Sequence, residues 1–180
     1  MSILDSPQKR EILMTDTHHE RTRGGERLFL EAEQFEEKGD FKSAFNRLLA
    51  GAQLGDTPSQ LNLGNFYAWG TGVRRDLEKA AYWYKKAYKG GDASGALNLA
   101  IDRRNEGNLR SAVFWFRRAV AMNCGDACIE LAKIYSAKKG GHEIARDLLR
   151  KALRLNRDGI SEDAKEKAES LLKAMLNTQF

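Results

Sequence analysis

One sequence pattern restricts the fold of this chain more than any other: a pair of apolar stripes of helical length that returns about every 32 to 36 residues. Within each stripe, apolar side chains recur three or four residues apart, which places them on one face of an α-helix. The best-preserved segments are Leu63-Gly64, Leu99-Ala100 and Leu131-Ala132 in the first stripe, and 80–87, 112–119 and 144–152 in the second. Two helices per period predict an all-α fold of stacked helix pairs, an α-solenoid.

The repeat divides the chain into six predicted segments. A polar N-terminal tail, flexible or docked on the body, comes first, and the pair Gly24-Gly25 predicts a break before the first strong helix. Four helix-turn-helix repeats follow. A final helix has apolar residues on one side only, as the terminal cap of a solenoid requires. The predicted boundaries are 1–25 for the tail, 26–56, 57–92, 93–123 and 124–157 for the repeats, and 158–180 for the capping helix.

The second repeat shows how its two helices are expected to pack. Gly64 allows the helix backbones to approach where a larger side chain would hold them apart. The loop at 70–72 supplies two glycines that tolerate positive φ, and Asp76 is placed to cap the next helix through its free amide groups. The apolar stripe of that helix includes Trp83. We expect Trp83 and its counterpart Trp115 in the third repeat to belong to the core.

Composition narrows the class of protein. The 180 residues allow a substantial core, and 42% hydrophobic with 31% charged residues is typical of a charge-rich helical protein. The formal net charge of +5 favours acidic partners, but it falls short of the clustered positive field of a dedicated nucleic-acid binder. No apolar run has the length of a secretory or membrane-spanning segment, so we expect a cytoplasmic protein that does not bind a membrane.

The residues that could carry metal or catalytic chemistry are few and scattered. Cys124 and Cys128 stand four residues apart, which in an intracellular chain favours reduced thiols over a disulfide. A metal site would need two more ligands, and the histidines, at 18, 19 and 142, have no zinc-like spacing with the cysteines. The chain also lacks a nucleophile elbow and a phosphate-binding loop. We therefore expect no metal, no cofactor and no enzyme activity.

Marked positions of the second repeat resemble a known family, the Sel-one-like repeat. The residues that carry the resemblance are Leu63, Gly64, Tyr67, Gly70, Gly72, Val73, Asp76, Lys79, Ala80, Trp83, Tyr84, Lys86 and Ala87. The first and third repeats, with GDFKSAF at 39–45 and GNLRSAV at 107–113, look more like the sister tetratricopeptide repeat. The resemblance covers about residues 27–155. It implies a right-handed superhelix in which the first helix of each pair, the A helix, lines a concave groove; the second is the B helix.

The resemblance also implies a scaffold that binds another protein or peptide without catalysis. Bacterial members of the Sel-one-like group include signalling regulators and immunity proteins that sit on secreted toxins, so a cytosolic inhibitor or immunity protein against a toxin is one expectation. By analogy with tetratricopeptide grooves, polar, aromatic and aliphatic side chains of the A helices should face the partner. These partner-binding candidates are Asn62, Asn65, Trp69, Asn98, Ile101, Arg104, Asn105, Glu130 and Lys133.

A basic stripe in the fourth repeat keeps nucleic acid open as an alternative partner. Arg146, Arg150 and Arg154 recur at four-residue spacing and project along one side of the B helix. Asp147 dilutes this charge, and no exposed aromatic ladder for base stacking is evident from the sequence. A nucleic-acid-associated adaptor is therefore the second prediction, behind a protein-binding scaffold.

Two further features of the sequence depart from the repeat pattern. Arg103 stands where the second and fourth repeats have tyrosine, and we expect its guanidinium either to reach water or to pair with Asp102 or Glu106. The first repeat is imperfectly capped, so exposure of Leu28 or Phe29 would allow a second copy of the chain to bind there.

Overall fold

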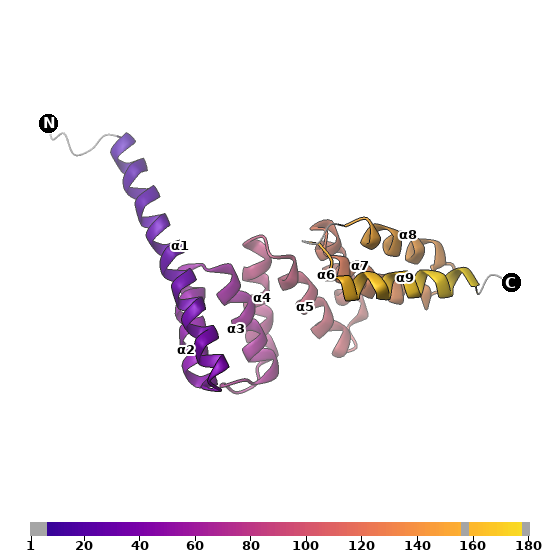
Figure 1. Ribbon diagram of the computed structural model, residues 1–180, viewed down its shortest axis with the longest axis horizontal. Helices are drawn as coiled ribbons and strands as arrows, with labels where there is room; N and C mark the ends of the chain where they lie inside the picture. Colours follow the sequence, from indigo (N-terminus) through magenta and orange to yellow (C-terminus); the bar gives the residue numbers. More distant parts are fainter. Residues whose placement is uncertain (1–6, 156–158, 178–180) are drawn as a thin grey trace. The chain divides into compact units, whose positions relative to one another are not determined.

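The computed structural model describes residues 7–155 and 159–177, and within these ranges it contains nine α-helices and no strand (Figure 1). This confirms the predicted all-α class. The helices are α1 (Pro7–Glu37), α2 (Phe41–Leu54), α3 (Thr57–Trp69), α4 (Leu77–Lys89), α5 (Ala93–Asn105), α6 (Leu109–Ala121), α7 (Gly125–Ser136), α8 (His142–Leu153) and α9 (Glu162–Asn177). They form two compact units, Met1–Gly91 with α1–α4 and Asp92–Phe180 with α5–α9.

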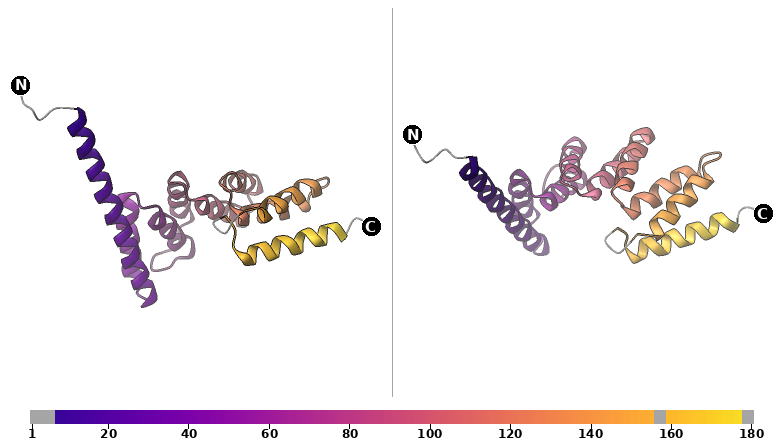
Figure 2. Two further views of the ribbon diagram at one scale, coloured as in Figure 1. Left: turned by 45° about the horizontal axis from the view of Figure 1, so that its top comes forward. Right: turned by 90° about the horizontal axis from the view of Figure 1, so that it is seen from above.

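Successive helices pack in pairs, as the repeat pattern predicts. In the first unit α1 packs against α2 and α3 against α4; in the second, α5 packs against α6 and α7 against α8. The final helix, α9, lies against α8 and α7 (Figure 2). The A helices of the four pairs are therefore α1, α3, α5 and α7, and the B helices are α2, α4, α6 and α8.

Aspartate and asparagine start most of the B helices and two A helices by accepting hydrogen bonds from free backbone amides. The predicted cap at Asp76 is confirmed, because its carboxylate accepts from the amides of Glu78 at 3.1 Å and Lys79 at 3.0 Å. The preceding loop holds Gly70 at φ +76° and Gly72 at φ +65°, as its sequence predicts. The first turn of α4 therefore begins at the residue that the repeat pattern indicates.

Small and large side chains alternate where A and B helices meet. A Cβ built on Gly64 would lie 2.6 Å from the ring of Tyr84, so the predicted close approach of α3 and α4 needs a glycine. The equivalent positions of the third repeat hold Ala100 and a shorter aromatic residue, Phe116, and both are fully buried. The predicted core place of Trp83 is only partly correct: it is half-buried, because it lies at the margin of the stripe that buries Tyr84.

The break predicted at the glycine pair is wrong. Helix α1 continues through Gly24-Gly25 without interruption, and its N-terminal half extends beyond the rest of the first unit (Figure 1). The reason is tertiary packing: Gly25 is buried, and a Cβ there would lie 2.7 Å from Cβ of Asp56, the residue that caps α3. Close contact with this cap offsets the roughly 1 kcal/mol that a glycine costs inside a helix. Residues 1–6 of the predicted tail lie outside the described residues.

In the second unit, α9 closes the core. A Cβ on Gly125, at the start of α7, would lie 2.6 Å from Cβ of Ile160, and the amide of Gly125 donates to the carbonyl oxygen of Gly159 at 2.6 Å. Ala164 and Ala168 of α9 are buried against α7 and α8, with the larger apolar residues of the same stripe packed around them. The predicted one-sided capping helix is confirmed. None of the helices in the described ranges combines the length and the apolar character needed to cross a membrane.

Candidate protein-binding surface

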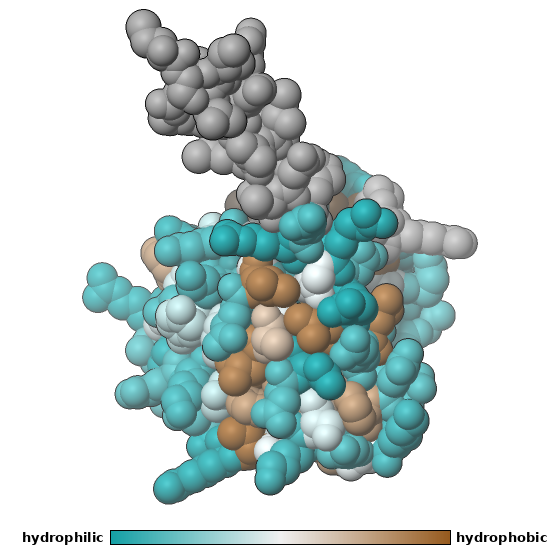
Figure 3. Space-filling model, turned by 90° about the vertical axis from the view of Figure 1, so that its left-hand side faces the viewer, coloured by the Kyte–Doolittle hydropathy of each residue, from teal (hydrophilic) through white to brown (hydrophobic). Residues whose placement is uncertain are grey.

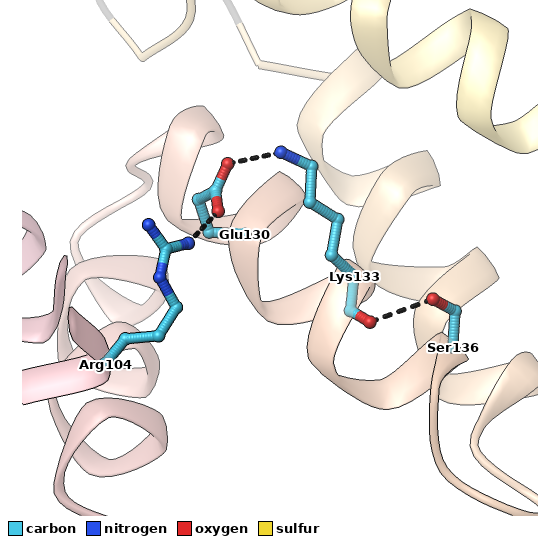
Figure 4. Close-up of polar contacts among 4 residues, drawn as sticks. All are labelled: Arg104, Glu130, Lys133 and Ser136. Atoms are coloured by element: carbon cyan, nitrogen blue, oxygen red, sulfur yellow. Dashed lines mark hydrogen bonds and ion pairs between the residues drawn. The ribbon is translucent and has the colours of Figure 1, made fainter. Parts of the chain in front are cut away.

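Three of the nine partner-binding candidates meet in one ion cluster on the A helices of the second unit. Arg104, in the last turn of α5, pairs with Oε2 of Glu130 on α7. Lys133, one turn further along α7, donates to the other carboxylate oxygen, Oε1, at 2.5 Å (Figure 4). We call Arg104, Glu130 and Lys133 the ion triad. It holds side chains of two consecutive A helices in a fixed arrangement at the surface.

The triad determines the protonation of its carboxylate. Burial acts to raise the pKa of Glu130, but the hydrogen bond and charge of Lys133, and then those of Arg104, outweigh burial and hold this pKa below its ordinary value. Glu130 is therefore ionised at neutral pH. Two cations share this single carboxylate, so the triad carries a net positive charge.

An apolar hollow of about 180 Å³ opens beside the triad. Lys133 and Ser136 of α7 lie at its polar edge, and the Ser136 hydroxyl donates to the carbonyl oxygen of Lys133 at 2.9 Å (Figure 4). Apolar side chains from three helices make the rest of the wall. They are Ala132 of α7, Leu149 of α8, and Leu171, Ala174 and Met175 of α9. We call this space the C-terminal hollow.

A second hollow, of about 350 Å³, lies between A helices of the first unit and has the opposite charge. Phe29, Glu33, Glu36 and Glu37 of α1 line it, together with the candidate Asn62 of α3. Burial, and secondly the charge of Glu33, raise the pKa of Glu36 above its ordinary value. We call this space the acidic hollow.

The candidates on α3 differ in how accessible their side chains are to a partner. Trp69 is 74% exposed and is seven residues from Asn62, so both lie on the same side of the helix, about 10 Å apart. Asn62 donates to the carbonyl oxygen of Pro58 at 3.2 Å. Asn65 is engaged inside the repeat, since its Oδ1 accepts from the Tyr84 hydroxyl at 2.9 Å. Trp69 is therefore the most accessible candidate on this helix.

The remaining candidates lie on α5, the helix that carries Arg104. Asn98 and Ile101 are half-buried, and Asn105 is exposed at the end of the helix. The structure thus brings Arg104, Glu130 and Lys133 together, and it leaves Asn98, Ile101 and Asn105 as neighbouring surface of the same unit.

The sequence pattern singled out Phe29 only for contact with a second copy, and the carboxylates of α1 that line the acidic hollow were not predicted. Phe29, Glu33 and Glu36 recur at intervals of four and three residues, a spacing that places them on one helix face. That signal was available. The apolar stripe through Ala32 on the buried side of the same helix is the stronger pattern in the sequence. The C-terminal hollow gave no comparable signal, because its wall comes from three helices.

Arg103 behaves as predicted. Its guanidinium donates to the carboxylate of Glu106 at 2.6 Å, one turn along the same chain segment, and the two side chains are 28% and 32% exposed. This confirms local pairing at the repeat position that elsewhere holds tyrosine.

The B helices carry exposed aromatic rings beside cations, which the sequence alone did not indicate. On α6, Phe114 is 46% exposed, and the guanidinium of Arg118 lies 3.7 Å from its ring centroid. On α4, Tyr82 is 52% exposed, with Lys86 at 5.8 Å from its ring. The half-buried Trp115, predicted to be core, packs edge-on against Phe114. Arg118 and Lys86 therefore each lie against an aromatic ring of their own helix.

The basic stripe of α8 is partly neutralised. Arg150 pairs with Asp147 at 3.1 Å, so this arginine of the stripe has an intramolecular partner. Both cysteines are free thiols, Cys128 buried and Cys124 half-buried. Within the described ranges, histidine, cysteine and carboxylate side chains form no group of three or more that could hold a metal ion.

Hydrophobic side chains also gather on the side of the first unit that carries α1 and α2. Figure 3 shows brown groups in the middle of this face, surrounded by hydrophilic teal. The exposed large side chains on these helices include Leu30 at 52%, Phe41 at 43% and Leu54 at 41%. Leu28 and Phe29, either of which was considered for contact with a second copy, are both half-buried, and Leu30 is the more exposed residue.

Comparison with protein families gives two matches to the Sel1 repeat, at residues 57–92 and 97–124. The first covers α3 and α4. The second covers most of α5 and α6, although the short turn of this repeat looks more like a tetratricopeptide repeat in sequence. No curated protein matches the chain.

Solved structures share the fold at low sequence identity. A Sel1 repeat protein from Oxalobacter formigenes is 19% identical, with a TM-score of 0.68 over 83% of this chain and 62% of that one. The protein c5321, a protective antigen of uropathogenic Escherichia coli strains displaying an SLR fold, is 17% identical, with a TM-score of 0.69 over 84% of this chain. The protein MamA is 19% identical, with a TM-score of 0.52 over 81% of this chain and 92% of its own. This chain spans only 33% of the length of c5321.

Proposed function

The chain is a Sel1 repeat protein, and we propose that it is a non-catalytic scaffold that binds another protein or peptide through its A helices. Sel1 repeats generally mediate interactions between proteins and are generally without catalysis. The proposal for this chain rests on its own surface. The nine candidates lie on α3, α5 and α7, all of them A helices.

The ion triad is the observation that carries the proposal. It fixes Arg104 of α5 and Glu130 of α7 across two repeats and places Lys133 at the edge of an apolar hollow. A charged group held next to an apolar recess suits recognition, because the recess supplies buried area and the charge supplies orientation. In the first unit, Trp69 offers a large ring that loses little conformational entropy on binding.

A narrower form of the proposal is a cytoplasmic inhibitor or immunity protein that captures one toxin molecule. An interface of standard size needs only about 800 Å² from each partner, which a chain of 180 residues provides. Support comes from the repeat architecture and from surfaces that offer both charge signs, the acidic hollow and the triad. Both would suit a charged toxin surface by complementarity.

Co-purification from native lysate with a matched pair of variants tests the scaffold. Trp69→Ala removes an exposed ring from an A helix, and Tyr82→Ala removes an exposed ring from the B helix of the same repeat. We expect wild type and Tyr82→Ala to recover the same protein, and Trp69→Ala to recover less of it. Recovery of RNA without protein would support the nucleic-acid alternative and overturn the proposal.

Self-association is a separate outcome of the same experiment. The exposed Leu30, Phe41 and Leu54 of the first unit would supply apolar area for a second copy. Light scattering on the purified chain separates this outcome from binding of a different protein. A dimer that Leu30→Asp converts to a monomer, with no other protein recovered, would point to self-association as the function of this face.

A further inference from the structure

The C-terminal hollow and the ion triad together point to the chemistry of a partner. We propose that the second unit binds an acidic peptide segment with one apolar anchor side chain. The anchor fills the hollow between α7, α8 and α9, and carboxylates next to the anchor face Lys133, Arg104 and Lys167. This inference rests on the proposed scaffold function and narrows it to a class of partner.

The size and wall of the hollow suit a single apolar side chain. Its volume is about 180 Å³, and its wall includes Leu149, Leu171 and Met175. An apolar cavity of about 150 Å³ accommodates a benzene ring. The hollow therefore has room for one leucine, methionine or phenylalanine side chain, and the contribution of such an anchor comes from the apolar area it buries.

The charges beside the hollow select an acidic segment. Lys133 belongs both to the wall and to the triad, in which two cations share the one carboxylate of Glu130. Lys167 is exposed and lies seven residues before Ala174, so it is on the same side of α9 as the wall. Glu169 and Lys173 lie on the opposite side of that helix, by the same spacing argument. Asp163 is exposed on the same side of α9, but it lies one turn further from the hollow, about 16 Å along the helix from Ala174. The charge on this side that is nearer to the hollow is therefore the positive charge of Lys167.

The acidic hollow of the first unit provides an internal contrast. Glu33, Glu36 and Glu37 line it, so a peptide rich in carboxylates is repelled there. Of these two hollows, charge therefore assigns an acidic segment to the C-terminal hollow of the second unit. Substitutions in the acidic hollow should therefore leave the binding of an acidic segment to the chain unchanged.

Fluorescence anisotropy with two synthetic peptides on the full chain tests the proposal. The first peptide, of about 14 residues, has one central leucine with glutamate and small neutral residues on both sides; the second has lysine in place of glutamate. We expect the glutamate peptide to bind at least about tenfold more tightly at low salt, with the difference shrinking as salt is added. Equal binding of the two peptides, or tighter binding of the lysine peptide, would overturn the proposal.

Two pairs of variants locate the binding site. Lys167→Glu should weaken binding of the glutamate peptide about two- to fivefold, whereas Lys173→Glu, an equal change of charge on the opposite side of α9, should not. Ala174→Trp fills the hollow and should reduce binding at least about tenfold. Ala121→Trp, at the exposed end of α6, is its control. Circular dichroism of each variant confirms that it is folded.

The outcomes separate this proposal from the scaffold function. If Ala174→Trp is folded and binds the glutamate peptide like wild type, the hollow is not the site and the inference fails. If Trp69→Ala still recovers less of the co-purified protein than wild type does, the scaffold function stands even though this inference has failed. Weaker binding of the glutamate peptide by both Ala174→Trp and Lys167→Glu, with both control variants unaffected, supports the inference.

Discussion

Arg104 and Glu130 join α5 and α7 by an ion pair whose carboxylate also accepts a hydrogen bond from Lys133. The pair links two repeats of the second unit through their A helices. The Glu130 side chain is 17% exposed and that of Arg104 is 36% exposed. The pair is therefore less accessible to solvent than the ion pair of Arg150 and Asp147 on α8, which is 48% and 67% exposed.

Replacing Glu130 by glutamine should destabilise the chain by about 1 kcal/mol at neutral pH, at the upper end for partly exposed pairs, because two cations lose their shared carboxylate. The folded-state pKa of Glu130 is lowered, so its contribution is complete above the unfolded-state pKa of about 4.3 and is lost as pH falls through the folded value. Urea unfolding at several pH values from neutral to acid measures the destabilisation and its dependence on pH. The gap between wild type and Glu130→Gln should close on acidification.

The control for this prediction is Asp147→Asn, which breaks the more exposed pair with Arg150. It should change the free energy of unfolding by less than about 0.5 kcal/mol. An equal effect of both substitutions would show that the triad has no special role in stability.

Gly64→Ala should destabilise the chain by about 1 to 3 kcal/mol, because the new methyl group would overlap the Tyr84 ring. The Tyr84 hydroxyl is held by Asn65, which limits how far the ring can move. Tyr84→Phe releases that hydrogen bond, so in its background Gly64→Ala should cost less. Urea unfolding of wild type, the two single variants and the double variant gives the coupling energy between positions 64 and 84. Additive effects would contradict the contact.

Glu36→Gln should raise the melting temperature at neutral pH. The pKa of Glu36 is raised by burial and by the charge of Glu33, so folding favours its protonated form. Its favourable contribution is present below the unfolded-state pKa and is lost as pH rises through the folded value. The difference between wild type and Glu36→Gln should therefore disappear in acid. A lower melting temperature at neutral pH would contradict the burial of this carboxylate.

Cys128 should resist alkylation by iodoacetamide at pH 7 to 8 in the folded chain. Burial is the main cause that raises its pKa, to about 11, so almost no thiolate is present. Cys124, half-buried and with a pKa that burial also raises, should react slowly but before Cys128. Mass spectrometry of a time course measures the order. Equal rates in the folded chain, or faster reaction of Cys128, would contradict the packing of α7 against α8.

The repeat pattern predicted the helix pairs and their starts because those depend on local chemistry. Asp76 caps α4, and Gly64 sits where Tyr84 needs space, and both effects involve residues close in sequence or one helix apart. The path of α1 was not predictable in the same way. Whether Gly25 breaks the helix depends on contact with Asp56, about 30 residues away, and local propensity carries no information on that contact.

The candidate surface was predictable only in part. Assigning residues to A helices predicted that Arg104, Glu130 and Lys133 share a surface. It did not predict that they form one ion cluster, because the cluster depends on how side chains of α5 and α7 meet. Asn65 was assigned to the partner, whereas its side chain serves Tyr84 inside the repeat. Both hollows arise from packing between helices. The acidic face of α1 follows from residue spacing, whereas the wall of the C-terminal hollow comes from three helices and is visible only in three dimensions.

Titration calorimetry with the protein that co-purifies with wild type tests the central claim, that the A helices bind the partner. The titration compares wild type with Trp69→Ala and with Tyr82→Ala, the exposed aromatic residues of one A and one B helix. We predict that Trp69→Ala weakens binding at least about tenfold, the loss typical of an aromatic hot spot, and that Tyr82→Ala stays within about twofold of wild type. The reverse order of these two losses would place the interface on the B helices and contradict the account.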